Sequence, residues 1–173
     1  MAHPDLQGFH RWLLATSTAR GLHEKLGWYL VKRPEIFANE IIEILDDSER
    51  FCFHMAAEMK PAEARRWLAR VREKARANAR RALARLVTKD VSACAIVAKQ
   101  DDAGDLDRIF ASHPRIHTAE GCFYRDVLRD VCAVSVRVIS PAALDATKVG
   151  KLARPWGRDQ KLAALAAWQV LED

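Results

Sequence analysis

The chain has 173 residues and a mass of 19.5 kDa, with 50% hydrophobic residues, 29% charged residues and a formal net charge of +5. This length fits a single helical domain over residues 1–173, and seven Gly with six Pro are too few for a disordered or linker-rich chain. No stretch approaches the ~20 apolar residues of a membrane helix, and polar residues interrupt the apolar ones at the N-terminus. We therefore expect a cytoplasmic protein that contacts no membrane.

The six prolines divide the chain into helical segments. Proline is tolerated in the first turn of a helix, where its missing N–H would be unpaired anyway. The apolar periodicity between prolines predicts helices over 4–18, 22–32, 34–46, 48–59, 61–87, 104–112, 118–132, 141–148 and 158–171. Expected N-caps are Ser48, Thr118, Ser140 and Asp159. The fold class predicted is all-α, a single-domain helical bundle with one long basic helix.

Two stretches favour β-structure instead. Residues 91–99 (VSACAIVAK) are short and apolar, and Val134, Val136 and Val138 alternate with polar residues as a half-buried strand would. The same valines also fit a continued helix. The alternative fold class is therefore α+β, with a small two-stranded element near 91–99 and 132–139.

The last predicted helix has its larger apolar residues at regular spacing. Leu162, Leu165, Trp168 and Leu171 recur every three residues and drift only slowly around a helix. This pattern predicts one buried face.

The positive charge of the protein is concentrated in one segment. Residues 60–89 contain eleven basic side chains and two acidic ones, Glu63 and Glu73, so the segment carries +9 while the other residues together carry −4. Small and apolar residues fall on one side of a helix over this segment: Ala64, Leu68, Val71, Ala75, Ala79, Ala82 and Leu86. We call this line of residues the alanine seam, and its small side chains allow a neighbouring helix, or a second copy of the chain, to come close.

The basic side chains of this helix predict a phosphate-binding surface. Arginine dominates among them, and its planar guanidinium binds phosphate oxygens in pairs and keeps its charge at physiological pH. The candidate nucleic-acid-binding residues are Arg66, Arg70, Lys74, Arg76, Arg80, Arg81, Arg85 and Lys89. Trp67 lies beside them, where it either stacks on a base or, as we expect, packs at the edge of the core.

An internal partner competes with this interpretation. Residues 34–58 contain seven acids and one base, Arg50, and could neutralise the basic helix from within the chain. However, residues 74–89 contain no acid at all, whereas a self-neutralising helix interleaves opposite charges four residues apart. An external anionic partner therefore remains the first hypothesis, and docking on an acidic protein is the alternative.

Histidine and cysteine residues near 113–132 raise the question of a metal site. His113, His117, Cys122 and Cys132 are ligand types that zinc accepts. Their spacing lacks the close pairs of structural zinc sites, and Pro114 is expected to interrupt the turn between the two histidines. We therefore assign no metal and no cofactor, and expect reduced thiols.

A second pattern of residues resembles one found in a known enzyme family. Arg108 and His113 match the loose R-x4–6-H pattern of helical ribonucleases of the higher-eukaryote-and-prokaryote nucleotide-binding type. With 19 Arg and six His in the chain, chance alone predicts about two such matches. Ile109 also stands where that family usually places a polar residue. A ribonuclease-like enzyme, with His113 as general acid or base, is therefore the third hypothesis.

These observations predict a nucleic-acid-binding accessory or structural subunit without catalytic residues. It would contact the phosphate backbone of DNA or RNA through the basic helix, in a nucleoprotein complex with other proteins. Two copies could associate through the alanine seam.

Overall fold

The computed structural model describes residues 44–87, 91, 93–145 and 158–172. Its elements are α1 (Cys52–Ala57), α2 (Pro61–Leu86), β1 (Ala93–Val97), α3 (Leu106–Phe110), α4 (His113–Val131), β2 (Ser135–Ile139), the 3-10 turn η2 (Pro141–Ala143) and α5 (Arg158–Glu172). The helices expected over 4–18 and 22–32 lie outside the described residues. The same holds for 34–46 apart from residues 44–46, which are not helical.

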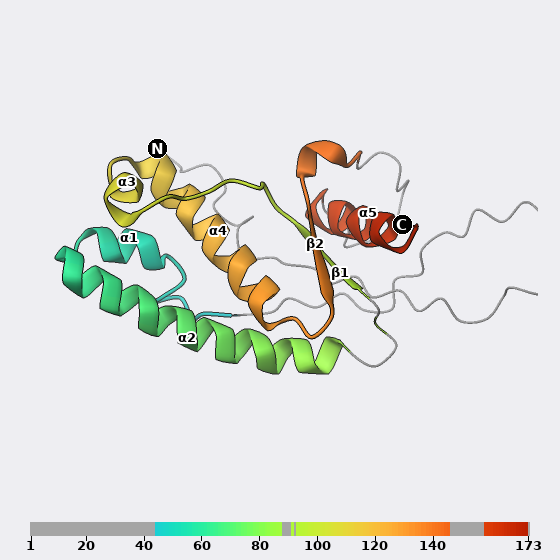
Figure 1. The fold of residues 1–173 in the computed structure, drawn as a ribbon, viewed down its shortest axis with the longest axis horizontal. Helices are drawn as coiled ribbons and strands as arrows, with labels where there is room; N and C mark the ends of the chain where they lie inside the picture. The colour runs from blue at the N-terminus through green and yellow to red at the C-terminus, as the bar shows by residue number, and fades with distance from the viewer. Residues whose placement is uncertain (1–43, 88–90, 92, 146–157, 173) are drawn as a thin grey trace, which may run out of the picture.

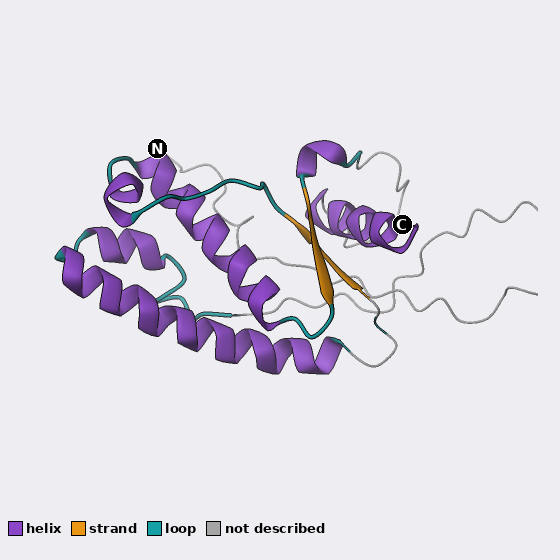
Figure 2. Cartoon of the chain, viewed as in Figure 1, coloured by secondary structure: helices purple, strands orange, loops and turns teal. Residues whose placement is uncertain are grey.

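A two-stranded parallel sheet makes the fold α+β. Ala93 pairs with Ser135 and Val97 pairs with Ile139, so the strands run in the same direction. Neighbouring parallel strands need a crossover connection, which α3 and α4 provide, and α5 packs against β1 (Figures 1 and 2). The all-α prediction is therefore wrong, and the alternative with strands near 91–99 and 132–139 is confirmed. The alternation of the valines around 134–138 reflects a strand with one face half-buried.

The long basic helix is confirmed, with bounds Pro61–Leu86 against the expected 61–87. Its 26 residues make a rod of about 39 Å. The alanine seam is buried from Ala64 to Ala82, with Ala64, Ala75 and Ala79 fully inaccessible, and α2 packs against α1 and α4. The seam is thus covered by helices of the same chain, which leaves it unavailable for the expected contact between two copies.

Helices α1, α2 and α4 share a hydrophobic core. Phe53 of α1 meets Phe123 of α4 edge to face, with ring centroids 6.1 Å apart, and Val71 of α2 and Val127 of α4 are fully buried beside them. The hydroxyl of Tyr124 donates to the carbonyl of Arg50 at 2.7 Å, which ties α4 to the start of α1.

Two predicted helix starts are wrong. Helix α1 begins at Cys52 rather than near Ser48, whose hydroxyl donates to Asp46 in the preceding turn. Helix α4 begins at His113 rather than 118, with Ser112 before it and Pro114 in its first turn. Thr118 is no cap, because it lies inside α4 and donates to the carbonyl of Pro114 at 3.1 Å. Pro114 starts this helix, as proline at a first turn does, and does not interrupt it.

The remaining boundaries differ less from the predictions. The segment expected at 104–112 forms the shorter α3, which Asp105 caps by accepting from the backbone N–H of Arg108 at 2.8 Å. Ser140 caps η2 as predicted, although that turn ends at Ala143. The expected helix over 158–171 is α5, and Asp159 lies within it rather than before it.

Burial along α5 differs from the predicted single face. Six consecutive residues, from Leu162 to Ala167, are all buried, so the helix is covered on more than one side. The three-residue spacing of the larger apolar residues did not reveal this, because the alanines between them are buried equally.

The close packing at the alanine seam predicts a position-specific response to added volume. Ala75→Leu should lower the free energy of unfolding by about 1–3 kcal/mol, because the added methylenes meet α1 or α4. Ala77→Leu, at an exposed position of the same helix, should change it by less than about 0.5 kcal/mol. Urea denaturation of both variants measures the difference, and equal costs would contradict the packing described.

Candidate functional site

The flanks of the basic helix are neutralised by carboxylates of the same chain. The ammonium of Lys74 donates to Asp46 at 2.8 Å and to Glu49, both from the turn before α1. The hydrogen bond from Lys74, together with that from Ser48, lowers the pKa of Asp46 to about 2. The sequence raised the possibility that the acids before α1 neutralise the basic helix. At Lys74 this neutralisation is present.

The opposite flank shows the same arrangement. Arg76 pairs with Glu73 at 2.8 Å on its own helix and with Asp130 of α4 at 2.6 Å. Hydrogen bonds from these two carboxylates, that of Asp130 first, raise the pKa of Arg76. Lys74 and Arg76 therefore already have anionic partners, although both belong to the predicted binding set.

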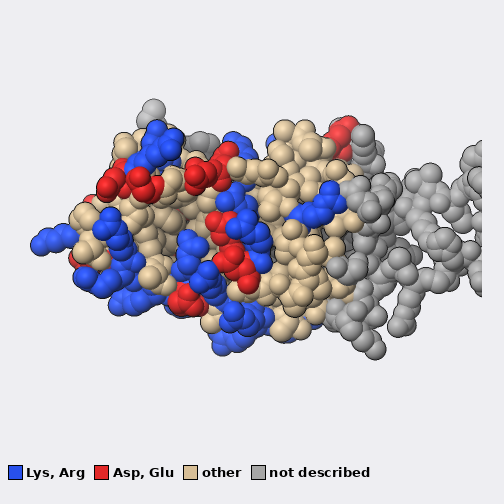
Figure 3. All heavy atoms as spheres, viewed as in Figure 1, with Lys and Arg blue, Asp and Glu red and all other residues tan. Residues whose placement is uncertain are grey.

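Four arginines point away from the packed side of α2, and we call Arg66, Arg70, Arg80 and Arg81 the outward arginines. They fall within an arc of about 100° opposite the alanine seam and span about 22 Å along the helix. All four are exposed, and among the described residues no carboxylate forms an ion pair with any of them. Arg81 donates instead to the neutral side chain of Asn78. In Figure 3, Lys and Arg atoms gather along the edge that α2 forms in Figure 1, with acidic atoms among them.

The other predicted members of this surface differ in their surroundings. Arg85 is exposed near the end of α2 and has an interaction with another group, whereas Lys89 lies outside the described residues. Trp67 is half-buried at the edge of the core, as expected, and the guanidinium of Arg70 lies over its ring, 5.7 Å from the centroid.

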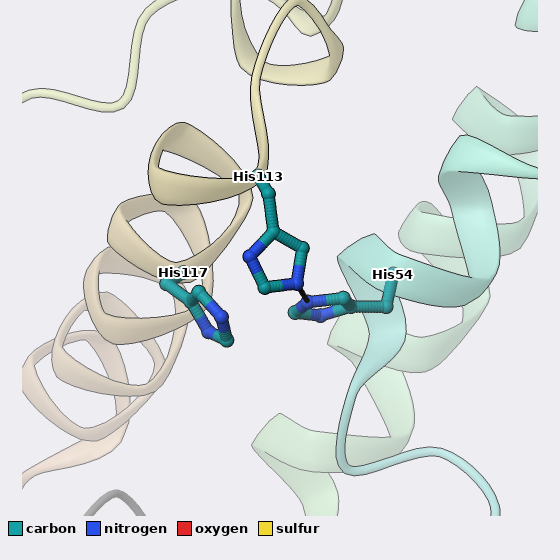
Figure 4. A group of neighbouring side chains, drawn as sticks. All are labelled: His54, His113 and His117. Carbon is teal, nitrogen blue, oxygen red and sulfur yellow. Dashed lines mark hydrogen bonds between the residues drawn. The ribbon is translucent and has the colours of Figure 1, made fainter. Parts of the chain in front are cut away.

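A histidine cluster forms where α1 meets the start of α4. His113 and His117 lie one turn apart on α4, and His54 reaches them from α1 (Figure 4). The ring centroids are 4.4 Å apart for His113 and His117, 4.7 Å for His54 and His117, and 5.0 Å for His54 and His113. One nitrogen of each ring lies within 4.8 Å of the corresponding nitrogens of the other two. This arrangement brings three metal-ligand groups together from two helices.

Glu120 supports the cluster from the protein interior. Its carboxylate, only 7% exposed, accepts from Nδ1 of His54 at 3.0 Å. It also accepts from the backbone N–H groups of Phe53 at 3.2 Å and His54 at 3.4 Å, and so caps a helix whose own N-cap, Phe51, offers no side-chain acceptor. Burial raises the pKa of Glu120, while the hydrogen bond from His54 lowers it.

Protonation of His117 is disfavoured by its surroundings. Burial, together with the charges that His54 and His113 would carry, lowers the pKa of His117. Neutral imidazoles are the form in which histidine binds a metal.

The structure brings together two of the four residues first considered for a metal. Cys122 is buried and donates its thiol to the carbonyl of Asp101 at 3.2 Å, while Cys132 lies 3.3 Å from Cys94, Sγ to Sγ. Neither cysteine belongs to the histidine cluster. The third member of the cluster is His54, which is distant in sequence and which no sequence pattern predicts as a ligand.

The paired histidines of α4 had a readable signal in the sequence. Ser112 followed by Pro114 is the pattern of a helix start, and a helix from 113 puts His113 and His117 on one face, four residues apart. An expected helix start at Thr118 leaves both histidines outside the helix, so their shared face is not predicted. His54 gave no such signal, because its approach depends on how α1 packs against α4.

No protein-family model, curated protein or solved structure matches this chain. Among the described residues, no helix combines the length and the apolar character that crossing a bilayer demands.

The capping role of Glu120 predicts unequal effects for two substitutions. Glu120→Ala leaves the N–H groups of Phe53 and His54 without their acceptor and should lower the free energy of unfolding by about 1–3 kcal/mol. Glu120→Gln keeps a carbonyl oxygen at this position and should retain most of that stability. Urea denaturation of the metal-free protein measures both, and equal losses would contradict the capping role.

Proposed function

We propose that this protein binds nucleic acid through the outward arginines of α2, which contact phosphate groups of the backbone. The observation that carries the proposal is that these four exposed cations lack carboxylate partners among the described residues, whereas the flanking Lys74 and Arg76 have them. The binding surface proposed is therefore narrower than the eight residues expected from the sequence. Arg85 and Lys89 extend the same helix toward its C-terminal end.

The spacing of the outward arginines supports a polyanion rather than a small anion. Arg66 and Arg70 are about 6 Å apart along the helix axis, and Arg80 follows Arg70 by about 15 Å. A guanidinium group binds one phosphate through two parallel hydrogen bonds. A ligand that engages all four groups must therefore carry charges distributed over about 22 Å, which is about six nucleotide steps of a duplex strand.

The chemistry of the surface favours backbone contacts over base recognition. Guanidinium groups on a convex helix surface neutralise phosphates and release counterions, which adds affinity without sequence discrimination. Arg70 also covers the ring of Trp67 and so occupies one face that a base would stack on. We accordingly propose a role as an accessory or structural subunit of a nucleoprotein complex.

Salt-dependent binding tests this proposal. The wild-type protein should bind short DNA or RNA with a log K that falls as log salt rises, with a slope near −0.9 per phosphate contact on duplex DNA. Replacing all four outward arginines by glutamine should remove most of the affinity and reduce the slope by about three to four, because up to four contacts are lost. Fluorescence anisotropy at several salt concentrations measures both quantities.

A matched control separates position from total charge. Replacing Lys99, Arg108, Arg129 and Arg158 by glutamine removes the same charge from exposed sites outside α2. This variant should keep most of the affinity. Equal losses in the two variants, or no binding of the wild type at low salt, would overturn the proposal.

The internal ion pairs predict a variant with stronger binding. Asp46→Asn with Glu49→Gln removes both partners of Lys74 and should increase nucleic-acid affinity several-fold, with a steeper slope by about one contact. Asp101→Asn with Asp102→Asn makes the same charge change at an exposed loop and should have a smaller effect. Anisotropy titrations of the two double variants compare them, and indistinguishable affinities would argue against a binding surface on α2.

The acidic-protein alternative predicts a different outcome in a co-purification experiment. Partners captured by the immobilised protein should be released by nuclease if nucleic acid bridges them. Partners that stay bound after nuclease, and are lost in the variant without outward arginines, would instead support docking on an acidic protein.

A further inference from the structure

We propose that His54, His113 and His117 form a binding site for a divalent transition-metal ion, with zinc as the expected occupant. The three imidazoles approach from α1 and α4 and point toward one another (Figure 4), and one nitrogen of each ring lies within 4.8 Å of one nitrogen of each of the other two rings. All three ligands proposed are nitrogen donors. Zinc, copper, nickel and iron accept imidazole, whereas magnesium and calcium require oxygen ligands.

The distances within the cluster fit ligands of one ion. Imidazole nitrogens bound to zinc at about 2.0–2.1 Å in a tetrahedral arrangement lie roughly 3.3–3.4 Å from one another. Nε2 of His54 lies 3.3 Å from Nε2 of His113. To bring the ligand nitrogen of His117 to the same ion, only the side chain of His117 has to rotate.

The backbone places two of the ligands in a known metal-binding relation. His113 and His117 are four residues apart on α4, so their side chains lie above one another on the same helix face. Zinc-binding histidines use this same spacing on helices. Pro114 lies in the first turn of α4, after the extended backbone of Ser112, and His113 is the first residue of the helix.

Glu120 prepares His54 as a ligand. Nδ1 of His54 donates to the Glu120 carboxylate at 3.0 Å, which leaves the lone pair on Nε2, the nitrogen that faces His113. A carboxylate that holds the second nitrogen of a ligating histidine fixes the ring orientation and raises its basicity. Two backbone N–H groups of α1 bind the same carboxylate, so Glu120 is itself held in place.

The cluster leaves room for a further ligand. The side chain of His54 is 28% exposed, and His113 lies at the surface. Among the described residues, no fourth side chain of a ligand type joins the three histidines. The fourth position of a tetrahedral ion would therefore be taken by water or by a small anion, as in sites with three protein ligands and one open position.

This site is separate from the proposed nucleic-acid surface. The outward arginines lie opposite the alanine seam, and the seam packs against α1 and α4, which carry the histidines. The two proposed sites therefore lie on different sides of α2, and each can be tested without the other.

Titration of the metal-free 173-residue chain with zinc sulfate tests the site. Calorimetry should give one equivalent bound, and zinc should raise the thermal unfolding midpoint because the ion binds the folded state. Cobalt(II) in place of zinc should give the visible absorption of a tetrahedral or five-coordinate ion without a sulfur-to-metal charge-transfer band. Such a band would place cysteine ligands on the ion and overturn the assignment.

Substitutions identify the ligands. His54→Gln, His113→Gln and His117→Gln should each weaken zinc binding by more than tenfold. Glu120→Gln should weaken it about 10–100-fold while the cobalt spectrum keeps its shape, because Glu120 orients a ligand without being one. The matched control, His10→Gln with His23→Gln, removes two histidines elsewhere in the sequence and should leave the affinity unchanged.

Folding of the variants is checked by circular dichroism, and a second measurement on the unaltered chain protects against a variant that fails to fold. In nuclear magnetic resonance spectra of the wild type, zinc should shift the imidazole signals of three histidines at one equivalent. No zinc binding, binding unaffected by the three cluster substitutions, or loss of binding in the His10 and His23 control would each overturn the proposal. The histidines would then be an aromatic cluster without a metal.

Discussion

The packing of α4 against α1 and α2 is the constraint on which the rest of the structure depends. Helix α4 is the main part of the crossover between two parallel strands, so its position is tied to the sheet at one end of the molecule. Along its length it contributes Phe123 and Val127 to the core shared with α1 and α2. Because α2 presents mostly alanine to its neighbours, its backbone approaches them closely, and its rotation about its own axis is determined by that contact.

This rotation decides which charges are available to a partner. Once the alanine seam is buried, Lys74 and Arg76 lie on the flanks of α2, beside carboxylates from the turn before α1 and from α4. Exposed ion pairs of this kind contribute only about 0–1 kcal/mol each, so they do little for stability. Their main effect is to divide the cations of one helix into neutralised flanks and an outward surface.

The same packing creates the histidine cluster. Glu120 lies on α4, yet its carboxylate serves α1 by capping the helix and holding His54. One buried acid therefore has two effects, because the groups that it binds are adjacent in the chain. An isolated buried carboxylate is unfavourable, and here three hydrogen-bond donors offset the cost of its burial.

Local patterns in the sequence were sufficient for the parts of the fold that depend on neighbouring residues. The length of α2, its buried seam and the alternation in β2 follow from periodicity, because each arises from the geometry of a single helix or strand. The start of α4 was also readable from Ser112 and Pro114, although the position of Thr118 suggested another start. The sequence also located the positive charge of the protein in one helix.

Only the tertiary structure decided which distant residues meet. The pairing of β1 with β2, the pairing of Lys74 with Asp46 and Glu49 and of Arg76 with Asp130, and the approach of His54 to His113 join residues that are 25 or more positions apart. Such contacts depend on how helices pack, and packing depends on the shapes of many side chains at once. A single sequence records those side chains but not their mutual positions, and for this reason the third histidine was found only in the folded chain.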